Sequence, residues 1–249
     1  MSGDALHPQG FGERRPGTSE RVLARARGGA LGPFDWLARA VSANARRVLD
    51  VQSGTGALMG RLSAPGRLVV GVELSWESLE HRQRHDATFV QADLAHLPFS
   101  EDSFDSVVTS LGLGVVENRD VLLAEAARVL RPGGVLAALT PSLRPLDVDD
   151  LKLSSQVTRL LRVMPQVPGS AEFRAKRALR SVGLTKVEDS RARFHFDVSN
   201  REDARALVDG MRSVLDQARA ENAVDFLASR AADGVVRFPL PMRRIVAIK

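Results

Sequence analysis

The sequence predicts a doubly wound α/β fold built around a mostly parallel sheet. Between residues 47 and 140, five short apolar segments alternate with helical segments, a pattern typical of a parallel sheet covered on both faces. A glycine-containing turn follows the first apolar segment, and an acidic residue ends the second. Because such sheets bind ligands at the carboxyl ends of their strands, we expect a small-molecule site at that edge.

The elements follow one another in a regular order. Residues 20–44 are expected to be helical, with a break at Gly32 and Pro33. The expected strands lie at 47–51, 68–73, 88–91, 105–111 and 134–140, and helices separate them at 56–63, 76–84 and 119–130. The later elements are a helix over 171–182, a strand over 184–196, one or two helices over 200–232 and a strand over 244–249.

This order predicts a single domain spanning residues 1–249. Residues 45–141 would form its ligand-binding core, preceded by a helical or capping segment at 1–44. The C-terminal half, 142–249, would supply a substrate cap or lid, because function varies in the segments outside a shared scaffold. Phe34, Trp36 and the segment 142–170 are candidates for the cap, although the same residues could simply pack on the sheet.

Composition excludes several kinds of chemistry. The chain has no cysteine, which rules out thiol catalysis, disulfides and cysteine-ligated metal sites, and it has no tyrosine. No apolar run approaches the roughly 18 residues of a membrane helix. The N-terminus shows no secretory signal, so we expect a cytoplasmic protein.

Charge is unevenly distributed along the chain. Residues 1–47 carry a net charge of +4, residues 48–141 carry −5 and residues 142–249 carry +6. The acidic middle and basic ends could attract each other within one fold. Alternatively, a basic rim could draw in an anionic substrate, nucleic acid included. The arginines are not interleaved with aromatic residues, which weakens the case for nucleic acid.

The turn after the first strand is the most informative segment. An apolar strand reaches Asp50 and then the sequence Gln52-Ser53-Gly54-Thr55-Gly56, a turn that can bring bare backbone N–H groups up to a charged ligand. Gln52 stands where a glycine is expected. Glu73 ends the second strand, 17 residues after Gly56, and is placed either to accept hydrogen bonds from ribose hydroxyls or to begin the next helix as a solvated carboxylate.

Two longer segments carry a family resemblance. The runs Gln91–Val108 and Arg128–Leu136, together with the turn and Glu73, resemble class I S-adenosylmethionine-dependent methyltransferases, in particular the branch that contains the ubiquinone/menaquinone C-methyltransferases. The resemblance covers about residues 45–141. It implies a Rossmann-like, seven-stranded, mostly parallel sheet whose last strand is antiparallel.

The resemblance also implies roles for residues on the first and fourth strands. Asp50, Gly54 and Gly56 would surround the methionine and ribose parts of the cofactor, and Ser110 would lie near the methionine part. Gln52 departs from the family's glycine. Its side chain could point away, donate to the cofactor carboxylate or narrow the pocket.

The second and third strands would bind the nucleoside. Glu73 would bind the ribose hydroxyls, with Leu74 against the adenine, and Asp93 would accept from the adenine amino group, with Leu94 beside the ring. Without a ligand, Asp93 could equally cap a turn.

No catalytic residue and no metal site is assigned. The histidine often found after the fourth strand in related sequences is absent from Leu111–Val115, and His81 and His85 match a metal pair only in their spacing. A sulfonium methyl donor is already electrophilic, so alignment of donor and acceptor can supply much of the rate without a strong base.

The function predicted from these observations is methyl transfer from S-adenosylmethionine to a small-molecule or lipid-like acceptor, by direct displacement, with release of S-adenosylhomocysteine. Two alternatives stay open. The basic ends suggest an RNA methyltransferase, and Gln52 together with the missing polar group after strand four suggests a non-catalytic module that binds the cofactor.

Overall fold

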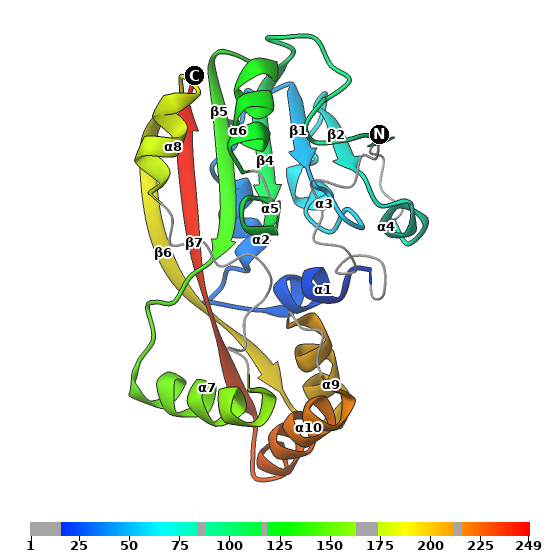
Figure 1. The fold of residues 1–249 in the computed structure, drawn as a ribbon, viewed down its shortest axis with the longest axis vertical. Coiled ribbons are helices and arrows are strands. Elements are labelled where there is room, and N and C mark those ends of the chain that lie inside the picture. The colour runs from blue at the N-terminus through cyan, green and yellow to red at the C-terminus, as the bar shows by residue number, and fades with distance from the viewer. Residues whose placement is uncertain (1–15, 84–87, 116–118, 163–173, 212–215) are drawn as a thin grey trace.

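The computed structural model describes residues 16–83, 88–115, 119–162, 174–211 and 216–249. Its centre is a seven-stranded sheet in the order β3-β2-β1-β4-β5-β7-β6. Six strands are parallel, and β7 runs antiparallel between β5 and β6. The predicted sheet, with its antiparallel last strand, is confirmed (Figure 1).

The first half of the chain builds the parallel part of the sheet. Its strands are β1 (Arg47–Val51), β2 (Leu68–Glu73), β3 (Thr88–Gln91), β4 (Phe104–Ser110) and β5 (Leu130–Pro141). Its helices are α1 (Thr18–Arg25), α2 (Pro33–Ala38), α3 (Met59–Leu62), α4 (Trp76–Glu80), α5 (Gly112–Val115) and α6 (Arg119–Val129). The carboxyl ends of β1, β2, β4 and β5 all point toward α1 in Figure 1.

The second half adds a lobe beyond that edge. Its elements are α7 (Val148–Leu161), α8 (Ala175–Ser181), β6 (Thr185–Val198), α9 (Arg201–Gly210), α10 (Gln217–Ala231) and β7 (Val236–Ile248). The strands β6 and β7 pair over their whole length and run past the end of β5, whose pairing with β7 stops at Pro141 and Met242. Helices α7, α9 and α10 pack around the projecting part of this two-stranded ribbon (Figure 1).

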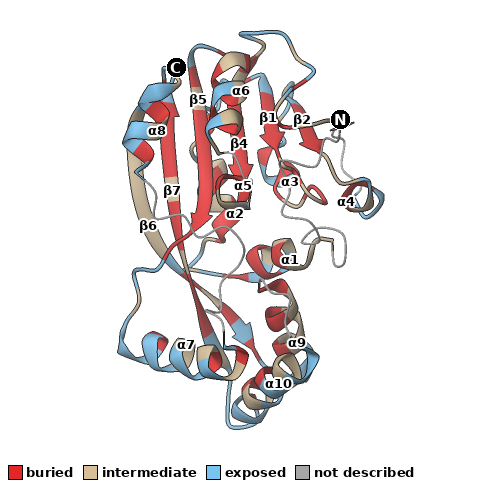
Figure 2. Cartoon of the chain, in the orientation of Figure 1, coloured by how far each residue is buried: buried red, intermediate tan, exposed pale blue. Residues whose placement is uncertain are grey.

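Two hydrophobic clusters cover the two faces of the sheet. One face carries α6 and α8, which bury residues such as Leu123 and Leu179. The other face carries α1 and α2, and its cluster continues without a break into α7, α9 and α10 of the lobe. Figure 2 shows the corresponding buried strands and the exposed outer sides of the helices. The lobe and the sheet therefore share one apolar core on the face beside α1.

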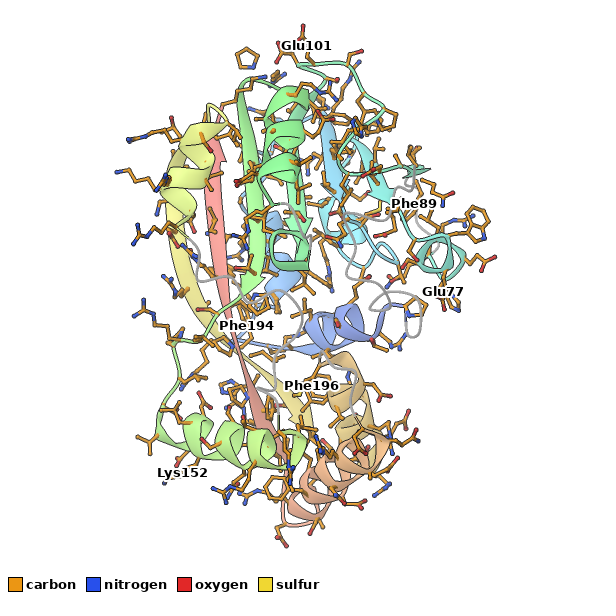
Figure 3. All side chains as sticks on the ribbon, viewed as in Figure 1. Glu77, Phe89, Glu101, Lys152, Phe194 and Phe196 are labelled. Carbon is orange, nitrogen blue, oxygen red and sulfur yellow. The ribbon has the colours of Figure 1, made fainter. Side chains whose placement is uncertain are left out.

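Helices α1 and α2 join the lobe to the sheet. On α1, the Ser19 hydroxyl donates to the Gly210 carbonyl of α9 at 2.7 Å, and the Arg25 guanidinium lies 4.6 Å from the centre of the Phe196 ring. On α2, the Trp36 ring lies 5.7 Å from that of Phe194. Phe194 and Phe196 are successive inward residues of β6 and lie near the middle of the molecule (Figure 3).

Several elements differ from the sequence-based expectation: α5 and α7 were not expected, β5 begins at Leu130, and α3 and β7 have other bounds. Helix α3 begins only at Met59, because Gly54 and Gly56 adopt left-handed backbone angles, with φ of 55° and 82°, and extend the turn. Strand β7 begins at Val236 rather than near residue 244. Pro239 and Pro241 argue against a strand in the sequence, but they lie in the part of β7 that has no β5 neighbour, where proline is tolerated. Expected elements within 84–87 and 171–173 lie outside the described residues.

A buried ion pair fixes the junction between β6 and β7. The Arg243 guanidinium is 4% exposed and donates to both carboxylate oxygens of Asp189, at 2.7 and 2.8 Å. Lys186 donates to the same carboxylate at 2.6 Å. The hydrogen bonds from Arg243 hold the pKa of Asp189 below its usual range.

Replacing Asp189 should therefore destabilise the fold. Asp189→Asn leaves the buried Arg243 charge poorly compensated, so we expect the free energy of unfolding to fall by about 3 kcal/mol. The native pKa of Asp189 is lowered, so the contribution is present above the ordinary carboxyl range and is lost as pH falls through the native pKa. Urea unfolding at neutral and acidic pH measures both effects.

Asp225→Asn is the matched control, because the Arg201–Asp225 pair is more than half exposed. It should cost less than about 1 kcal/mol. If both variants lost the same free energy of unfolding, the buried Asp189–Arg243 pair would contribute no more to stability than an exposed pair.

Candidate cofactor site at the carboxyl edge of the sheet

The turn between β1 and α3 forms the floor of the candidate site. The Ser53 amide donates to the Val72 carbonyl of β2 at 2.9 Å, and the Gly56 amide donates to the Ser53 carbonyl at 2.8 Å. A side chain on Gly56 would meet the Phe89 ring of β3 at 2.6 Å. The turn is thus held against β2 and β3, and glycine is required where the ring approaches the backbone.

Glu73 holds the turn from the side of β2. Its carboxylate is 3% exposed and accepts from the amides of Gly54, Leu74 and Ser75 at 2.9, 2.9 and 3.0 Å. These bonds join the first turn to the end of the second strand. Each carboxylate oxygen has more than one lone-pair direction, so the ribose role predicted for Glu73 is compatible with them.

Glu20 holds the turn from the side of α1, and the sequence reasoning missed it. Its carboxylate accepts from the Thr55 amide at 2.9 Å, the Thr55 hydroxyl at 2.7 Å and the Ala57 amide at 3.3 Å. A side chain on Gly54 would come within 1.9 Å of the Glu20 carboxylate. Glu20 precedes the turn by more than thirty residues and belongs to no motif, so only the packing of α1 reveals its role.

Buried polar atoms without partners gather at the same edge. Among the described residues, no donor reaches either carboxylate oxygen of Asp50, and no partner reaches the hydroxyls of Ser53, Thr109 and Ser110. Buried polar groups in native proteins are nearly always satisfied, so a concentration of unsatisfied ones calls for an explanation. A polar ligand at the ends of β1 and β4 would provide the missing partners.

Gln52 takes up a strained backbone conformation. Its φ is 61°, in the left-handed region, which explains why related sequences carry glycine there. Its side chain reaches toward the start of α5, because a side chain built on Gly112 would meet the Gln52 Oε1 at 2.9 Å. That oxygen is buried and has no partner among the described residues. The side chain therefore lies between the β1–α3 turn and the start of α5.

The residues that follow β2 and β3 show no buried, unpaired polar atoms comparable to those of Asp50 and Ser110 among the described residues. Asp93 is half-buried, and its Oδ1 accepts from the Ala95 amide at 2.8 Å, so it does cap a turn. Leu74 is half-buried, whereas Leu94 is buried in the core on the α6 face. The nucleoside contacts expected of Leu74, Asp93 and Leu94 stay predictions.

Three carboxyl groups, those of Glu20, Asp50 and Glu73, lie close enough at this edge to influence one another. Burial raises the pKa of Asp50 well above its ordinary range, and the carboxylates of Glu20 and Glu73 raise it further. Burial also raises the pKa of Glu20, although hydrogen bonds from the turn oppose this. Such a site favours a positively charged ligand, which would stabilise the ionised carboxylates.

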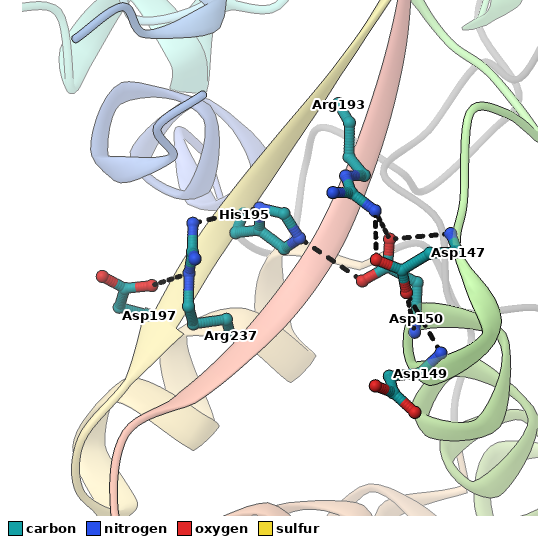
Figure 4. A network of polar contacts seen from close by, with 7 residues as sticks. All are labelled: Asp147, Asp149, Asp150, Arg193, His195, Asp197 and Arg237. Carbon is teal, nitrogen blue, oxygen red and sulfur yellow. Dashed lines mark hydrogen bonds and ion pairs between the residues drawn. The ribbon is translucent and has the colours of Figure 1, made fainter. Parts of the chain in front are cut away.

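His195 lies outside this site. Its Nε2 is 3.3 Å from Asp150 of α7, and Arg193 donates to the same carboxylate at 3.1 Å (Figure 4). Arg237 of β7 completes the group through His195 Nδ1 at 3.4 Å. These contacts tie α7 to the β6–β7 ribbon, and no residue from the ends of β1, β2 or β4 takes part.

A search of the described residues finds no group of histidine or acidic side chains arranged to hold a metal ion. The carboxylates of Glu20 and Glu73 accept hydrogen bonds from the turn. His81 hydrogen-bonds the Glu77 carbonyl through Nδ1, and His85 lies outside the described residues.

The structure is an α/β protein whose glycine turn and three buried or half-buried carboxyl groups lie together at the carboxyl edge of its sheet. The family described as "Methyltransferase domain" matches residues 49–138. That segment is therefore similar to methyltransferase domains, in agreement with the resemblance seen in residues 45–141.

Curated relatives match the same part of the chain. A demethylmenaquinone methyltransferase from Clavibacter sepedonicus is 43% identical over 137 residues, which are 51% of this chain and 56% of the relative. The ubiquinone/menaquinone biosynthesis C-methyltransferase UbiE of Paracoccus denitrificans is 35% identical over 144 residues, which are 54% and 56% of the two chains. The chain spans about half the length of the curated relatives it matches.

A solved structure extends the likeness in fold to most of the chain. Geranyl diphosphate methyltransferase in complex with SAM superposes with a TM-score of 0.54 at 16% identity, covering 95% of this chain and 92% of that one. The lobe beyond the sheet therefore belongs to a fold seen in methyltransferases.

Because no described donor reaches the Asp50 carboxylate, replacing it with a neutral side chain should stabilise the folded protein. The native pKa of Asp50 is raised, so its carboxyl favours the folded state when protonated and opposes it as pH rises through the native pKa. Asp50→Asn should raise the melting temperature of the ligand-free protein at pH 8 by about 2–4 °C, as expected for about 1 kcal/mol. The gain should shrink at pH 5.

Thermal unfolding of the ligand-free protein at the two pH values measures this effect, with Asp233→Asn, at an exposed position, as the control. A lower melting temperature for Asp50→Asn at pH 8 would contradict the argument.

Proposed function

We propose that the protein is an S-adenosylmethionine-dependent methyltransferase acting on a small-molecule or lipid-like acceptor. The observation that carries the proposal is the set of buried, unpaired polar atoms of Asp50, Gln52 and Ser110 at the edge of a matched methyltransferase domain. The matched relatives are named for quinone methylation, which supports an acceptor of lipid character.

The residues present fit this cofactor. S-adenosylmethionine, when bound, supplies a methyl group on a positively charged sulfur, and its ammonium, ribose and adenine groups offer hydrogen-bond donors. Asp50 and Gln52 provide unpaired acceptors, and Glu73 and Asp93 provide carboxylates at the ends of the next strands. Gly54 and Gly56 keep the approach to the turn open, while Glu20 and Glu73 hold the turn in place.

The negative charge of the site also suggests how substrate and product are distinguished. Methyl transfer turns the sulfonium into a neutral thioether, so the product loses a positive charge. The carboxylates of Glu20, Asp50 and Glu73 therefore attract the methyl donor more strongly than S-adenosylhomocysteine. Their contribution to the reaction is to bind and orient the donor, and no general base is assigned.

The acceptor would enter between the sheet edge and the lobe. In this proposal the ribbon of β6 and β7 and helices α7, α9 and α10 form the cap expected of residues 142–249. Trp36 of α2, which is half-buried and packs against the buried Phe194 ring at 5.7 Å, is a candidate contact on the sheet side. Phe34 is buried, and Met164 lies outside the described residues, so neither supplies a described surface.

Titration calorimetry tests cofactor binding directly. We expect micromolar binding of S-adenosylmethionine that is strongly reduced in Glu73→Gln and Asp93→Asn, because each change removes a carboxylate acceptor. Asp50→Asn should weaken binding of S-adenosylmethionine more than binding of S-adenosylhomocysteine. Melting temperatures check that the variants are folded. The proposal fails if the intact protein binds neither compound.

The acceptor class is tested with a tritium-labelled methyl donor and three extracts: lipids, water-soluble metabolites and RNA. Label in the lipid or metabolite fraction supports the proposal. Label in RNA would establish the RNA methyltransferase alternative instead, and binding of the donor without transfer to any fraction would point to the non-catalytic module.

Gln52 can be tested by restoring glycine. Gln52→Gly relieves the left-handed backbone strain but increases the freedom of the unfolded chain, so stability should change by less than about 1 kcal/mol. Loss of the unpaired acceptor should weaken S-adenosylmethionine binding by up to about tenfold. Tighter binding to the glycine variant would show instead that Gln52 only obstructs the pocket.

A further inference from the structure

The outer face and N-cap of α8 carry a row of basic side chains. Ala175 and Leu179 bury the inner face of the helix in the core. Its outer face and N-cap expose four basic side chains, Arg174, Lys176, Arg177 and Arg180. None of the four has an ion pair with another described residue. The cofactor site accounts for none of this charge.

A groove beside α8 adds to the positive surface. The groove has a volume of about 800 Å³ and lies between α8 and the strands β6 and β7. Lys186 of β6 and Arg243 of β7 also line it. Asp189, the carboxylate among the described lining residues, is already bound by both of these cations. With the four basic side chains of α8 and its N-cap, the described lining residues include six cations and one carboxylate, a formal net charge of +5.

Exposed apolar side chains lie on the same side of the molecule. Val148 and Leu151 in the first turn of α7 are 65% and 51% exposed, and Leu143 in the preceding loop is 47% exposed. In Figure 1, α8 lies beside β6 at the upper left, and the first turn of α7 lies at the lower left. Lys152 projects from the same end of α7 (Figure 3) and lies 3.3 Å from the exposed Asp149, so this turn contributes apolar surface and no excess of positive charge.

We propose that α8, its groove and the first turn of α7 dock the protein onto a membrane that bears anionic phospholipid headgroups. The headgroup phosphates bind the cations of the α8 groove, because clustered basic side chains on an amphipathic helix are attracted to such surfaces. Val148 and Leu151 contact the interfacial region, where exposed apolar side chains gain by leaving water. Docking needs no step of the methyl transfer, so it can be tested independently.

A lipid surface fits these features better than RNA does. Among the residues that the structure describes, the lining of the groove contains no aromatic side chain on which a base could stack. RNA binding would also leave Val148 and Leu151 without a role, whereas a membrane interface uses charge and apolar surface together. A candidate membrane-spanning helix is not found among the described residues, so the contact proposed is peripheral.

Vesicle co-sedimentation of the full chain tests the proposal. Vesicles of phosphatidylcholine mixed with an equal amount of phosphatidylglycerol should bind the protein, and vesicles of phosphatidylcholine alone should bind it weakly. Binding to the mixed vesicles should fall steeply with added salt. Glycerol phosphate as a competitor separates a bilayer surface from a site for free phosphate, because it displaces the protein only in the second case.

Substitutions test whether α8 and the first turn of α7 form the surface that contacts the membrane. Removing three cations with Lys176→Gln, Arg177→Gln and Arg180→Gln should weaken binding to mixed vesicles by about 100-fold. The control, Arg39→Gln, Arg46→Gln and Arg82→Gln, removes the same charge from exposed positions on other elements and should have a much smaller effect. Val148→Ser with Leu151→Ser should reduce the binding that persists in high salt.

Three results would overturn the proposal. The first is equal binding to both kinds of vesicle. The second is an equal loss in the α8 and control variants. The third is tight RNA binding that the α8 variant abolishes, in a protein that does not sediment with mixed vesicles. Loss of methyl transfer with vesicle binding intact would concern the proposed function alone.

Discussion

The hydrogen bonds between Glu20 and the glycine turn are the constraint on which the arrangement of the molecule depends. One carboxylate on α1 accepts two amides and a hydroxyl of the turn. The same helix contacts α9 through Ser19 and packs Val22 so closely against Gly210 that no side chain fits there. Helix α1 therefore contacts both the glycine turn and the lobe, and it links the two.

The same region shows why binding sites are not optimised for stability. Asp50 is 1% exposed, has no described hydrogen-bond donor and lies near two other carboxylates, which is unfavourable in the absence of a cation. Gln52 adds a left-handed backbone at a non-glycine residue. The surrounding strands tolerate these costs because they are deeply buried and paired on both sides. In the proposed function, a sulfonium donor would compensate the negative charge that is unfavourable at this edge.

Much of the fold could be predicted because the bounds of many strands and helices depend on residues that are close together in the sequence. The strands β1, β2 and β3 coincide with the expected ranges, since each is a short apolar run bounded by polar or turn residues. Asn200 caps α9 as its side-chain chemistry suggests, accepting from the Asp203 amide at 2.9 Å. The length of β7 could not be predicted in this way. Whether a strand accepts Pro239 and Pro241 depends on which of its edges is paired, and that is a property of the assembled sheet.

By itself the sequence determined the α/β class, the order of the core strands and the carboxylates that end β1 and β2, because hydrophobic periodicity and turn chemistry act over a few residues. Only the tertiary structure decided that Glu20 holds the turn and that the Gln52 side chain reaches toward Gly112. It also decided that six cations line one groove beside α8. These arrangements join residues far apart in the chain, and their geometry follows from how α1, β6 and β7 pack. No local pattern of residues carries that information.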